Sequence, residues 1–497
     1  MKDGMKLQKS WMPLLRNFLR RKLMLFKSAK SFMIQSINIL LMSVFVNANA
    51  DTHSAAPSHQ YNVIIIGAGS AGLGAAQDLY QHGIKDVLVI EARNRIGGRV
   101  WTIAPWGAAT DLGASWIMHE KDNPLAKMTK TFGINSVPTV YGGGDSLANK
   151  FTSFDLYDSN GKRISDQEMK TALALINKFS EDISQHKLPL KNNATMEDAF
   201  SAFSKQENLQ GKDLEVFNFL AKDMVESEAA ADLNQISLST METVHSKMSG
   251  DHLLPEGGYI RLFSQFVKNI SIILNNPVTE VDYNPQGVTV ITKKGVYHAR
   301  YAIVTLPLGV LQAGSVKFSP ELPKDKLASI KRMRMGYFNK VYLLFDKPFW
   351  HSDSEWISMM PTKDNPTAHY EILNLYKYVK QPILLFFSAG FFSEKTESWA
   401  DKQIIDDTMH HLKIIYGNDI PSPSAYLITR WGKDPYARGS YTYPVIGSSI
   451  EDYKNLAAPV ENELFFAGEA TSSTDPSTVH GAYMSGVAAA ELVMRQP

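Results

Sequence analysis

Three glycines follow a short apolar segment in a spacing that can bind a dinucleotide. Residues 63–66 (VIII) are β-branched, which is typical of a buried strand, and a segment of helical composition begins a few residues later. Between them, Gly67, Gly69 and Gly72 form the pattern GxGxxG. The first glycine permits a tight turn, the second lets the backbone approach a pyrophosphate, and the third lets helix and strand pack closely. The pyrophosphate can then bind the N–H groups at the positive end of the helix.

A carboxylate completes this pattern. Glu91 follows a second apolar run, residues 87–90, and lies 19 residues beyond Gly72. Its side chain can accept hydrogen bonds from the ribose hydroxyls of a dinucleotide. We therefore interpret residues 61–99 as a dinucleotide-binding strand, turn, helix and strand. A structural turn in an ordinary α/β domain is the alternative interpretation.

The residues after Glu91 favour FAD over a nicotinamide cofactor. Arg93 and Arg99 supply guanidinium groups, and Gly98 belongs to a glycine pair between them. Fixed bidentate donors and a close backbone suit a pyrophosphate. A nicotinamide enzyme has no need of this second element.

With these residues in view, the stretch GAGSAGLGAA…EARNRIGGRVWT resembles the opening of the flavin-containing amine oxidases. The resemblance spans about residues 61–494. Over residues 430–441 (RWGKDPYARGSY) it is closest to the polyamine oxidases and the flavin-dependent histone lysine demethylases. It implies an α/β fold, in which a Rossmann-like FAD-binding domain of the glutathione-reductase type is interleaved with an α+β substrate-binding domain. The implied FAD-binding domain comprises residues 58–120, 250–320 and 430–497, and the implied substrate-binding domain comprises residues 121–249 and 321–429.

The resemblance also implies the site residues. FAD contacts fall, beside the glycines named above, on Ser70, Glu91, Arg93, Arg99, Ser115, Trp116, Val278, Glu469, Thr478 and Val479. The substrate pocket falls on Trp116, Met118, Glu226, Glu228, Trp431, Tyr441 and Thr478. Glu226 and Glu228 can also be solvated charges on a helix face. Met118 stands where several polyamine oxidases carry Glu or His, and Thr478 stands where one plant subgroup has Tyr.

Lys340 is the candidate catalytic residue. It stands at the head of an apolar run, residues 341–345, where an edge charge that reaches solvent is the plain interpretation. The surrounding segment resembles the amine oxidase segment whose Lys hydrogen-bonds, through a water, to flavin N5. In that role the ammonium holds the water that hydrolyses the imine and stabilises negative charge that develops on dioxygen.

The reaction implied by the resemblance is the oxidation of a C–N bond of a polyamine or other amine. A hydride passes to flavin N5, O2 is reduced to H2O2, and the imine is hydrolysed to an aldehyde and an amine. Two alternatives stay open: an L-amino acid or monoamine oxidase of the same family, and a flavin-binding redox protein that does not turn over. A carboxylate substrate would need an Arg fork, for which the sequence offers no candidate.

The composition excludes several classes of site. The 497 residues carry a net charge of +1, so no general affinity for nucleic acid is indicated. No Cys is present, which excludes disulfides, thiolate metal sites and a cysteine-linked flavin. FAD is therefore expected to bind non-covalently. The 13 His residues are scattered, and no cluster of metal ligands is apparent.

The N-terminal segment differs from the rest of the chain. Residues 1–30 contain nine Lys or Arg and one Asp, whereas residues 31–50 are uncharged. An apolar region at residues 37–46 precedes Ala48-Asn49-Ala50, which is typical of a secretory signal and its cleavage site. We therefore expect residues 1–50 to direct export to the periplasm or medium. An uncleaved membrane anchor is the alternative, because twenty uncharged residues can just span a bilayer.

Overall fold

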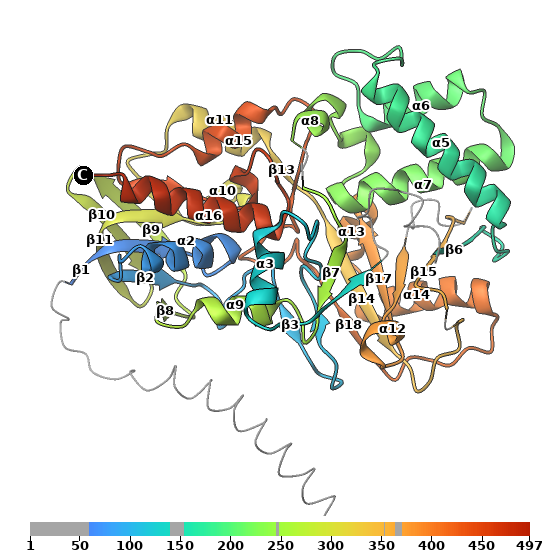
Figure 1. Cartoon of the computed structure of the whole chain (residues 1–497), viewed down its shortest axis with the longest axis horizontal. Helices are drawn as coiled ribbons and strands as arrows, with labels where there is room; N and C mark the ends of the chain where they lie inside the picture. Colours follow the sequence, from blue (N-terminus) through green and yellow to red (C-terminus); the bar gives the residue numbers. More distant parts are fainter. Residues whose placement is uncertain (1–58, 140–153, 245–247, 352, 363–369) are drawn as a thin grey trace, which may run out of the picture. The chain divides into compact units, whose positions relative to one another are not determined.

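The computed structural model describes residues 59–139, 154–244, 248–351, 353–362 and 370–497. The expected export signal at residues 1–50 lies outside the described residues. Within the described part of the chain, no helix combines the length and the apolar character needed to cross a membrane. The described elements build two large sheets, which appear in Figure 1 with their helices.

The first sheet has eight strands in a mixed arrangement. Five of them run parallel in the order β20, β11, β1, β2, β8, and β9 and β10 join β11 as an antiparallel meander that β12 extends. The bounds are β1 (Gln60–Ile66), β2 (Val87–Ile90), β8 (Ser271–Ile273), β9 (Val278–Asn284), β10 (Gly287–Thr292), β11 (Gly295–Val304), β12 (Lys317–Ser319) and β20 (Leu464–Phe466). Strand β1 lies at the centre of the parallel part of the sheet and has helices over both faces, so it is buried on both sides. This explains the unbroken apolar run at residues 63–66.

Both faces of this sheet are covered. Val63 and Ile65 of β1 belong to the core on one face, whereas Ile64 and Ile66 belong to the core on the other. The first core is shared with α2 (Ser70–Gln81), α3 (Pro124–Thr131), α9 (Ile260–Phe266) and α16 (Val479–Met494). The second is shared with α10 (Leu308–Gln312), α11 (Lys324–Arg332) and α15 (Ile450–Ala457).

Helices α2 and α16 lie side by side against the sheet (Figure 1). Small residues permit this contact. A Cβ on Gly486 would lie 2.0 Å from the carbonyl oxygen of Ala71, so the two backbones approach as closely as glycine allows. The first turn of α16 is thereby held next to the glycine loop that precedes α2.

The second sheet has six strands in the order β18, β14, β17, β16, β15, β6. Their bounds are β6 (Phe154–Tyr157), β14 (Phe338–Leu344), β15 (Trp356–Met359), β16 (Glu371–Asn374), β17 (Ile383–Ala389) and β18 (Ala425–Ile428). One core pairs the sheet with α5 (Asp166–Ser184), α6 (Met196–Gln206) and α7 (Gly211–Ala229), drawn in green in Figure 1. The opposite core pairs it with α13 (Gly390–Thr396) and α14 (Asp401–Tyr416).

The remaining elements are short. Two-stranded ladders join β3 (Thr102–Ile103) to β4 (Thr110–Asp111), β5 (Ser136–Thr139) to β7 (His252–Pro255), and β13 (Arg334–Met335) to β19 (Thr442–Tyr443). The helices α8 (Leu238–Thr243) and α12 (Tyr376–Val379) and the single turns η1 (Leu233–Gln235) and η2 (Glu469–Thr471) complete the description. The predicted α/β class is confirmed. The residue boundaries of the two domains stay a prediction.

Candidate functional site

A cavity of about 800 Å³ receives side chains from both large sheets and from α2, α7 and α16. This volume lies within the range of about 300–1,000 Å³ that is usual for ligand sites. Most of the residues expected from the sequence line it: Gly67, Gly69, Ser70, Glu91, Arg93, Gly98, Arg99, Ser115, Trp116, Met118, Glu228, Val278, Lys340, Trp431, Tyr441, Glu469, Thr478 and Val479. Gly72 and Glu226 are not among the lining residues.

The glycine loop has the geometry that a dinucleotide requires. Gly67 has a φ of +110°, a region that favours glycine. A Cβ on Gly72 would lie 1.9 Å from the carbonyl oxygen of Gly67, so this glycine lets helix and loop pack. A Cβ on Gly69 would meet no atom within 4 Å, and Gly69 lines the cavity. Gly69 is also the N-cap residue of α2, so no side chain binds the first N–H groups of this helix. The open space at Gly69 and these N–H groups are therefore available to a ligand.

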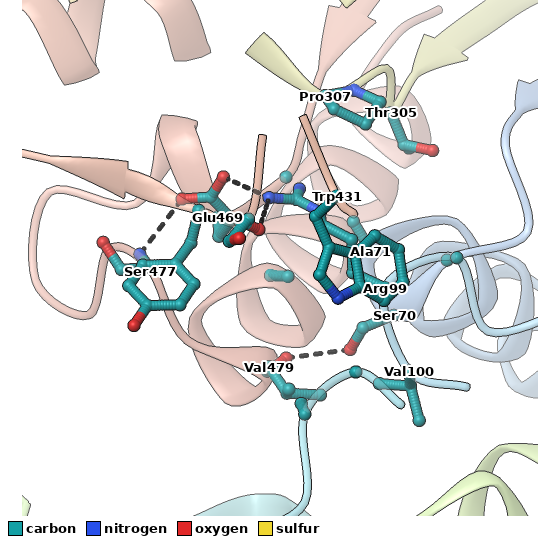
Figure 2. Close-up of a pocket in the computed structure, with 18 of the residues that line it drawn as sticks. Ser70, Ala71, Arg99, Val100, Thr305, Pro307, Trp431, Glu469, Ser477 and Val479 are labelled. Carbon is teal, nitrogen blue, oxygen red and sulfur yellow. Dashed lines mark hydrogen bonds and ion pairs between the residues drawn. The ribbon is translucent and has the colours of Figure 1, made fainter. Parts of the chain in front are cut away.

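Ser70 connects this loop to the last helix. Its hydroxyl donates to the carbonyl oxygen of Val479 at 2.8 Å (Figure 2). Val479 is the first residue of α16, and Thr478 caps that helix by accepting from the N–H of Gly481 at 2.9 Å. The N-termini of α2 and α16 therefore open onto one cavity, and both present positive dipole ends to it.

Glu91 lies directly after β2 and is buried. One carboxylate oxygen accepts from the N–H of Ala68 at 2.7 Å, and the other accepts from the N–H of Arg93 at 2.8 Å. Burial raises the pKa of Glu91, and these two backbone donors oppose the rise. A carboxylate has about four acceptor sites, so Glu91 can bind ribose hydroxyls while it ties the glycine loop to the end of β2.

Arg99 and Glu469 form an ion pair at the cavity wall. The Nη1 of Arg99 lies 2.8 Å from the Oε1 of Glu469 and 3.0 Å from the carbonyl oxygen of Ser440. The Oε2 of Glu469 accepts from the hydroxyl of Thr442 at 2.6 Å and from the N–H of Ser477 at 3.1 Å. Figure 2 shows this carboxylate between Arg99 and Ser477. The pair joins three separate chain segments at the place where the FAD contacts are expected.

Arg93 also binds a carboxylate. Its two terminal nitrogens each donate to one oxygen of Asp434 at 2.7 Å, and its guanidinium lies 5.4 Å from the ring centre of Tyr436. The sequence suggested only that Arg93 binds the cofactor. In the structure, Arg93 lines the cavity and two of its five N–H donors also hold a distant loop.

Lys340 lies inside the second sheet and not at its edge. Strand β14 pairs with β17 on one side and with β18 on the other, and Lys340 is 3% exposed. Its Nζ donates to the carbonyl oxygens of Asp111 at 2.8 Å and Gly113 at 2.6 Å, and to the Oγ of Ser115 at 2.6 Å. An edge charge that reaches solvent is therefore excluded, and the side chain instead ends at the segment that runs along the cavity.

The charge of Lys340 is strongly affected by burial. Burial lowers the pKa of the Lys340 ammonium to about 7, although the nearby charge of Asp111 opposes this shift. Burial likewise raises the pKa of Asp111 to about 6, against hydrogen bonds from Thr102 and from the N–H of Tyr259. A lysine whose pKa lies near the working pH, in a cavity, is typical of a functional site.

Two aromatic rings lie close to this lysine, and two more line the cavity. The Nζ of Lys340 lies 5.9 Å from the ring centre of Trp116 and 5.4 Å from that of Phe387. Trp431 donates through its indole N–H to the carbonyl oxygen of Leu112 at 3.1 Å, and the hydroxyl of Tyr441 donates to the carbonyl oxygen of Ser227 at 2.6 Å. All four rings line the cavity, which gives it apolar walls with few polar groups.

The two acidic candidates on α7 differ. Glu228 is exposed at the cavity wall. Glu226 is buried, and its Oε1 accepts from the N–H of Leu233 at 3.1 Å. The structure therefore places Glu228 in the expected pocket, whereas the side chain of Glu226 lies outside it and binds the turn that follows the helix.

Sequence reasoning missed a group of histidines. The rings of His119 and His252 are 5.0 Å apart, and those of His119 and His480 are 6.4 Å apart. All three line the cavity, and the Nε2 of His480 lies 3.3 Å from the Oδ1 of Asp475. They come from three separate segments, so no spacing in the sequence relates them. In the part of the chain that the structure describes, no group of His, Cys, Asp and Glu is arranged to hold a metal ion.

The residues present fit the nucleotide part of FAD. The open position at Gly69, the uncapped start of α2 and the carboxylate of Glu91 suit a pyrophosphate and a ribose. Val278 lines the same cavity at the start of β9, where only its backbone can offer polar groups. The roles of the individual residues stay predictions.

The sequence is similar to known proteins along most of its length. The family model described as flavin containing amine oxidoreductase matches residues 70–494. Polyamine oxidase 4 of Oryza sativa subsp. japonica is 34% identical over 441 residues, which cover 86% of this chain and 88% of that protein. Polyamine oxidase 2 of Arabidopsis thaliana is 34% identical over 439 residues, which cover 86% and 87%.

Two further comparisons extend this result. Lysine-specific histone demethylase 1 homolog 3 of Oryza sativa subsp. japonica is 32% identical over 449 residues, which cover 87% of this chain but 54% of that protein. A solved structure of wild-type putrescine oxidase superposes with a TM-score of 0.69 at 19% identity, covering 88% of this chain and 100% of that one. At this identity the structural likeness concerns the fold alone.

Proposed function

This chain belongs to the flavin-containing amine oxidoreductases, and from this premise we propose that it oxidises polyamines at a C–N bond with non-covalently bound FAD. FAD, when bound, accepts a hydride from the carbon next to the amine nitrogen and passes the electrons to O2. The observation that carries the proposal is one cavity, which joins the glycine loop and Glu91 to the buried Lys340 and its aromatic walls.

The cavity walls suit an amine. A free amine is mostly protonated at neutral pH, and only its neutral form can give up a hydride. Rings of Trp116, Phe387 and Tyr441 desolvate a ligand here, which favours the neutral form of the reacting nitrogen. The exposed carboxylate of Glu228 can attract a second, charged nitrogen, as a polyamine provides.

Lys340 serves the later steps. As an ammonium it stabilises the negative charge that develops on O2, and with Ser115 it can orient the water that hydrolyses the imine to an aldehyde and an amine. Ser440 stands where the monoamine oxidases place a flavin-linking Cys. Its hydroxyl donates to the carbonyl oxygen of Phe338 at 2.9 Å.

The second candidate is an L-amino acid oxidase of the same family. Its substrate carboxylate would need an arginine at the aromatic end of the cavity, whereas Arg438, which lines the cavity, belongs to the loop that Asp434 fastens to Arg93.

A substrate panel tests the proposal. Peroxide release by the purified protein should be fastest with spermine, spermidine or their acetylated forms, and slower with monoamines and L-amino acids. Preference for an L-amino acid would support the second candidate, and no release with any amine would contradict the proposal. Acid precipitation should leave FAD in the supernatant. Flavin in the pellet would indicate a covalent bond, for which the histidines of the cavity would be candidates.

We also propose that the protein is exported and cleaved after Ala50. The support is the charge and apolar pattern of residues 1–50. N-terminal sequencing of the exported protein should begin at Asp51, whereas retention of the full N-terminus in washed membranes would indicate an anchor.

A further inference from the structure

A loop from the C-terminal part of the chain reaches the nucleotide end of the cavity. This loop, residues 432–439, is called the clasp loop here. Its turn is closed by the carbonyl oxygen of Asp434, which accepts from the N–H groups of Ala437 at 3.2 Å and Arg438 at 2.9 Å. Pro435, Tyr436 and Arg438 line the cavity. The clasp loop therefore forms part of the wall beside Glu91.

Arg93 holds the tip of the clasp loop. The guanidinium and the carboxylate of Asp434 make two parallel hydrogen bonds of 2.7 Å, and the side chains are only 11% and 17% exposed. Bidentate pairs of this kind are stronger and more directional than ordinary surface ion pairs. The two residues are 341 positions apart in the sequence, so the pair fastens segments that chain connectivity leaves independent.

The same arginine is joined to the expected ribose ligand. The N–H of Arg93 donates to Glu91, and the other oxygen of Glu91 accepts from the N–H of Ala68 in the glycine loop. A continuous chain of hydrogen bonds therefore links the glycine loop, Glu91, Arg93 and the clasp loop around the nucleotide end of the cavity.

The base of the clasp loop is anchored separately. The indole of Trp431 donates to Leu112, the N–H of Gly432 donates to the Oε1 of Glu397 at 2.7 Å, and the N–H of Gly439 donates to the carbonyl oxygen of Trp431 at 3.0 Å. Loss of the Arg93 contact therefore frees the tip and leaves the base in place.

From this arrangement we propose that the Arg93–Asp434 pair is a clasp that retains FAD by closing the wall at its nucleotide end. The inference rests on the proposed cofactor. It assigns to Asp434 a positioning role that acts through Arg93 and the clasp loop.

The test is the rate at which FAD leaves the holoenzyme. Asp434→Asn keeps the size of the side chain and an oxygen that can accept from the N–H of Tyr436, which lies 2.9 Å from the Oδ1 of Asp434. We expect the dissociation rate, followed by the fluorescence of released FAD after dilution, to rise about tenfold, the scale of one lost charge-assisted contact. The matched control is Asp401→Asn, whose carboxylate also binds an arginine, Arg430, at 2.7 Å but lies outside the cavity wall.

A double-mutant cycle completes the test. If the clasp is the cause, Arg93→Gln combined with Asp434→Asn releases FAD no faster than the more affected single variant. A wild-type rate in Asp434→Asn, or an equal rise in Asp401→Asn, would overturn the proposal. A lower melting temperature of FAD-free Asp434→Asn than of the FAD-free wild type would also overturn it, because the pair would then support the fold and not the cofactor.

The readout separates this inference from the proposed function. A protein that holds FAD but oxidises no amine would contradict the proposed function, and its FAD release would still decide the role of the clasp. A protein that binds no FAD would overturn both.

Discussion

The Nζ of Lys340 lies 2.6 Å from the Oγ of Ser115, although 225 residues separate the two in the sequence. An ammonium has three donors, and here they meet three protein oxygens, those of Asp111, Gly113 and Ser115. Ser115 accepts from Lys340, so its own hydroxyl hydrogen is left to point elsewhere. A water that Lys340 orients is therefore reached most directly through Ser115, which also lines the cavity.

Lys340→Met removes the charge and keeps the length of the side chain. We expect FAD to be retained and turnover to fall by about ten- to a thousand-fold, the scale of one lost electrostatic donor. Stopped-flow measurements of flavin reduction and reoxidation would show which half-reaction slows. Lys347→Met, which changes an exposed lysine just beyond the same strand, is the control. Wild-type rates in both half-reactions would show that Lys340 takes no part in the chemistry.

The reaction with O2 should depend on pH through Lys340. Because burial lowers its pKa to about 7, the ammonium is present below this pH and is lost as the pH rises through it. We expect the rate of reoxidation to fall by about tenfold or more over that interval, since the stabilising charge disappears. The pH profile of Lys340→Met should lack this step. A step of the same size in the variant would assign the titration to another group.

Glu91→Ala should weaken FAD binding and leave the fold intact. The lost hydrogen bonds to the ribose amount to about 1.5–3 kcal/mol, or roughly 10- to 150-fold in affinity. Titration of the FAD-free protein, followed by quenching of flavin fluorescence, measures the change, and circular dichroism reports the fold. Full flavin occupancy after dialysis of the variant would refute the assignment of the dinucleotide site.

Two glycines of the GxGxxG pattern should respond differently to substitution by alanine. Gly69→Ala adds a methyl group where no atom lies within 4 Å, so the protein should fold normally but bind FAD at least about tenfold more weakly. Gly72→Ala forces a Cβ to within 1.9 Å of the carbonyl oxygen of Gly67, so the free energy of unfolding should fall by at least about 1–3 kcal/mol. Gly295→Ala, with contacts no closer than 3.6 Å, is the control. Equal FAD affinity in Gly69→Ala and wild type would contradict the pyrophosphate assignment.

Local patterns allowed much of the fold to be predicted. The expected strands at residues 63–66 and 87–90 correspond to β1 and β2, and the helical segment expected after the glycine pattern corresponds to α2. Each rests on a short-range signal, such as a continuous apolar run or helical periodicity.

The contacts that complete the site depend on distant residues. The pairing of Arg93 with Asp434, the three partners of Lys340 and the group of His119, His252 and His480 all arise from packing of separate segments. A positive φ at His119, 55°, turns the chain at this point, and no residue type marks it in the sequence. Glu226 and Glu228 lie two positions apart on one helix, where only the surrounding structure decides which of them reaches the cavity.

The central claim is that an amine reduces a flavin held in this cavity. It is tested most directly by mixing the holoenzyme with spermine or spermidine in the absence of O2 and following the visible absorbance of the bound flavin. We predict rapid bleaching by polyamines, slower bleaching by monoamines and amino acids, and recovery of the absorbance when O2 is admitted. A flavin that dithionite bleaches but that no amine bleaches would contradict the account.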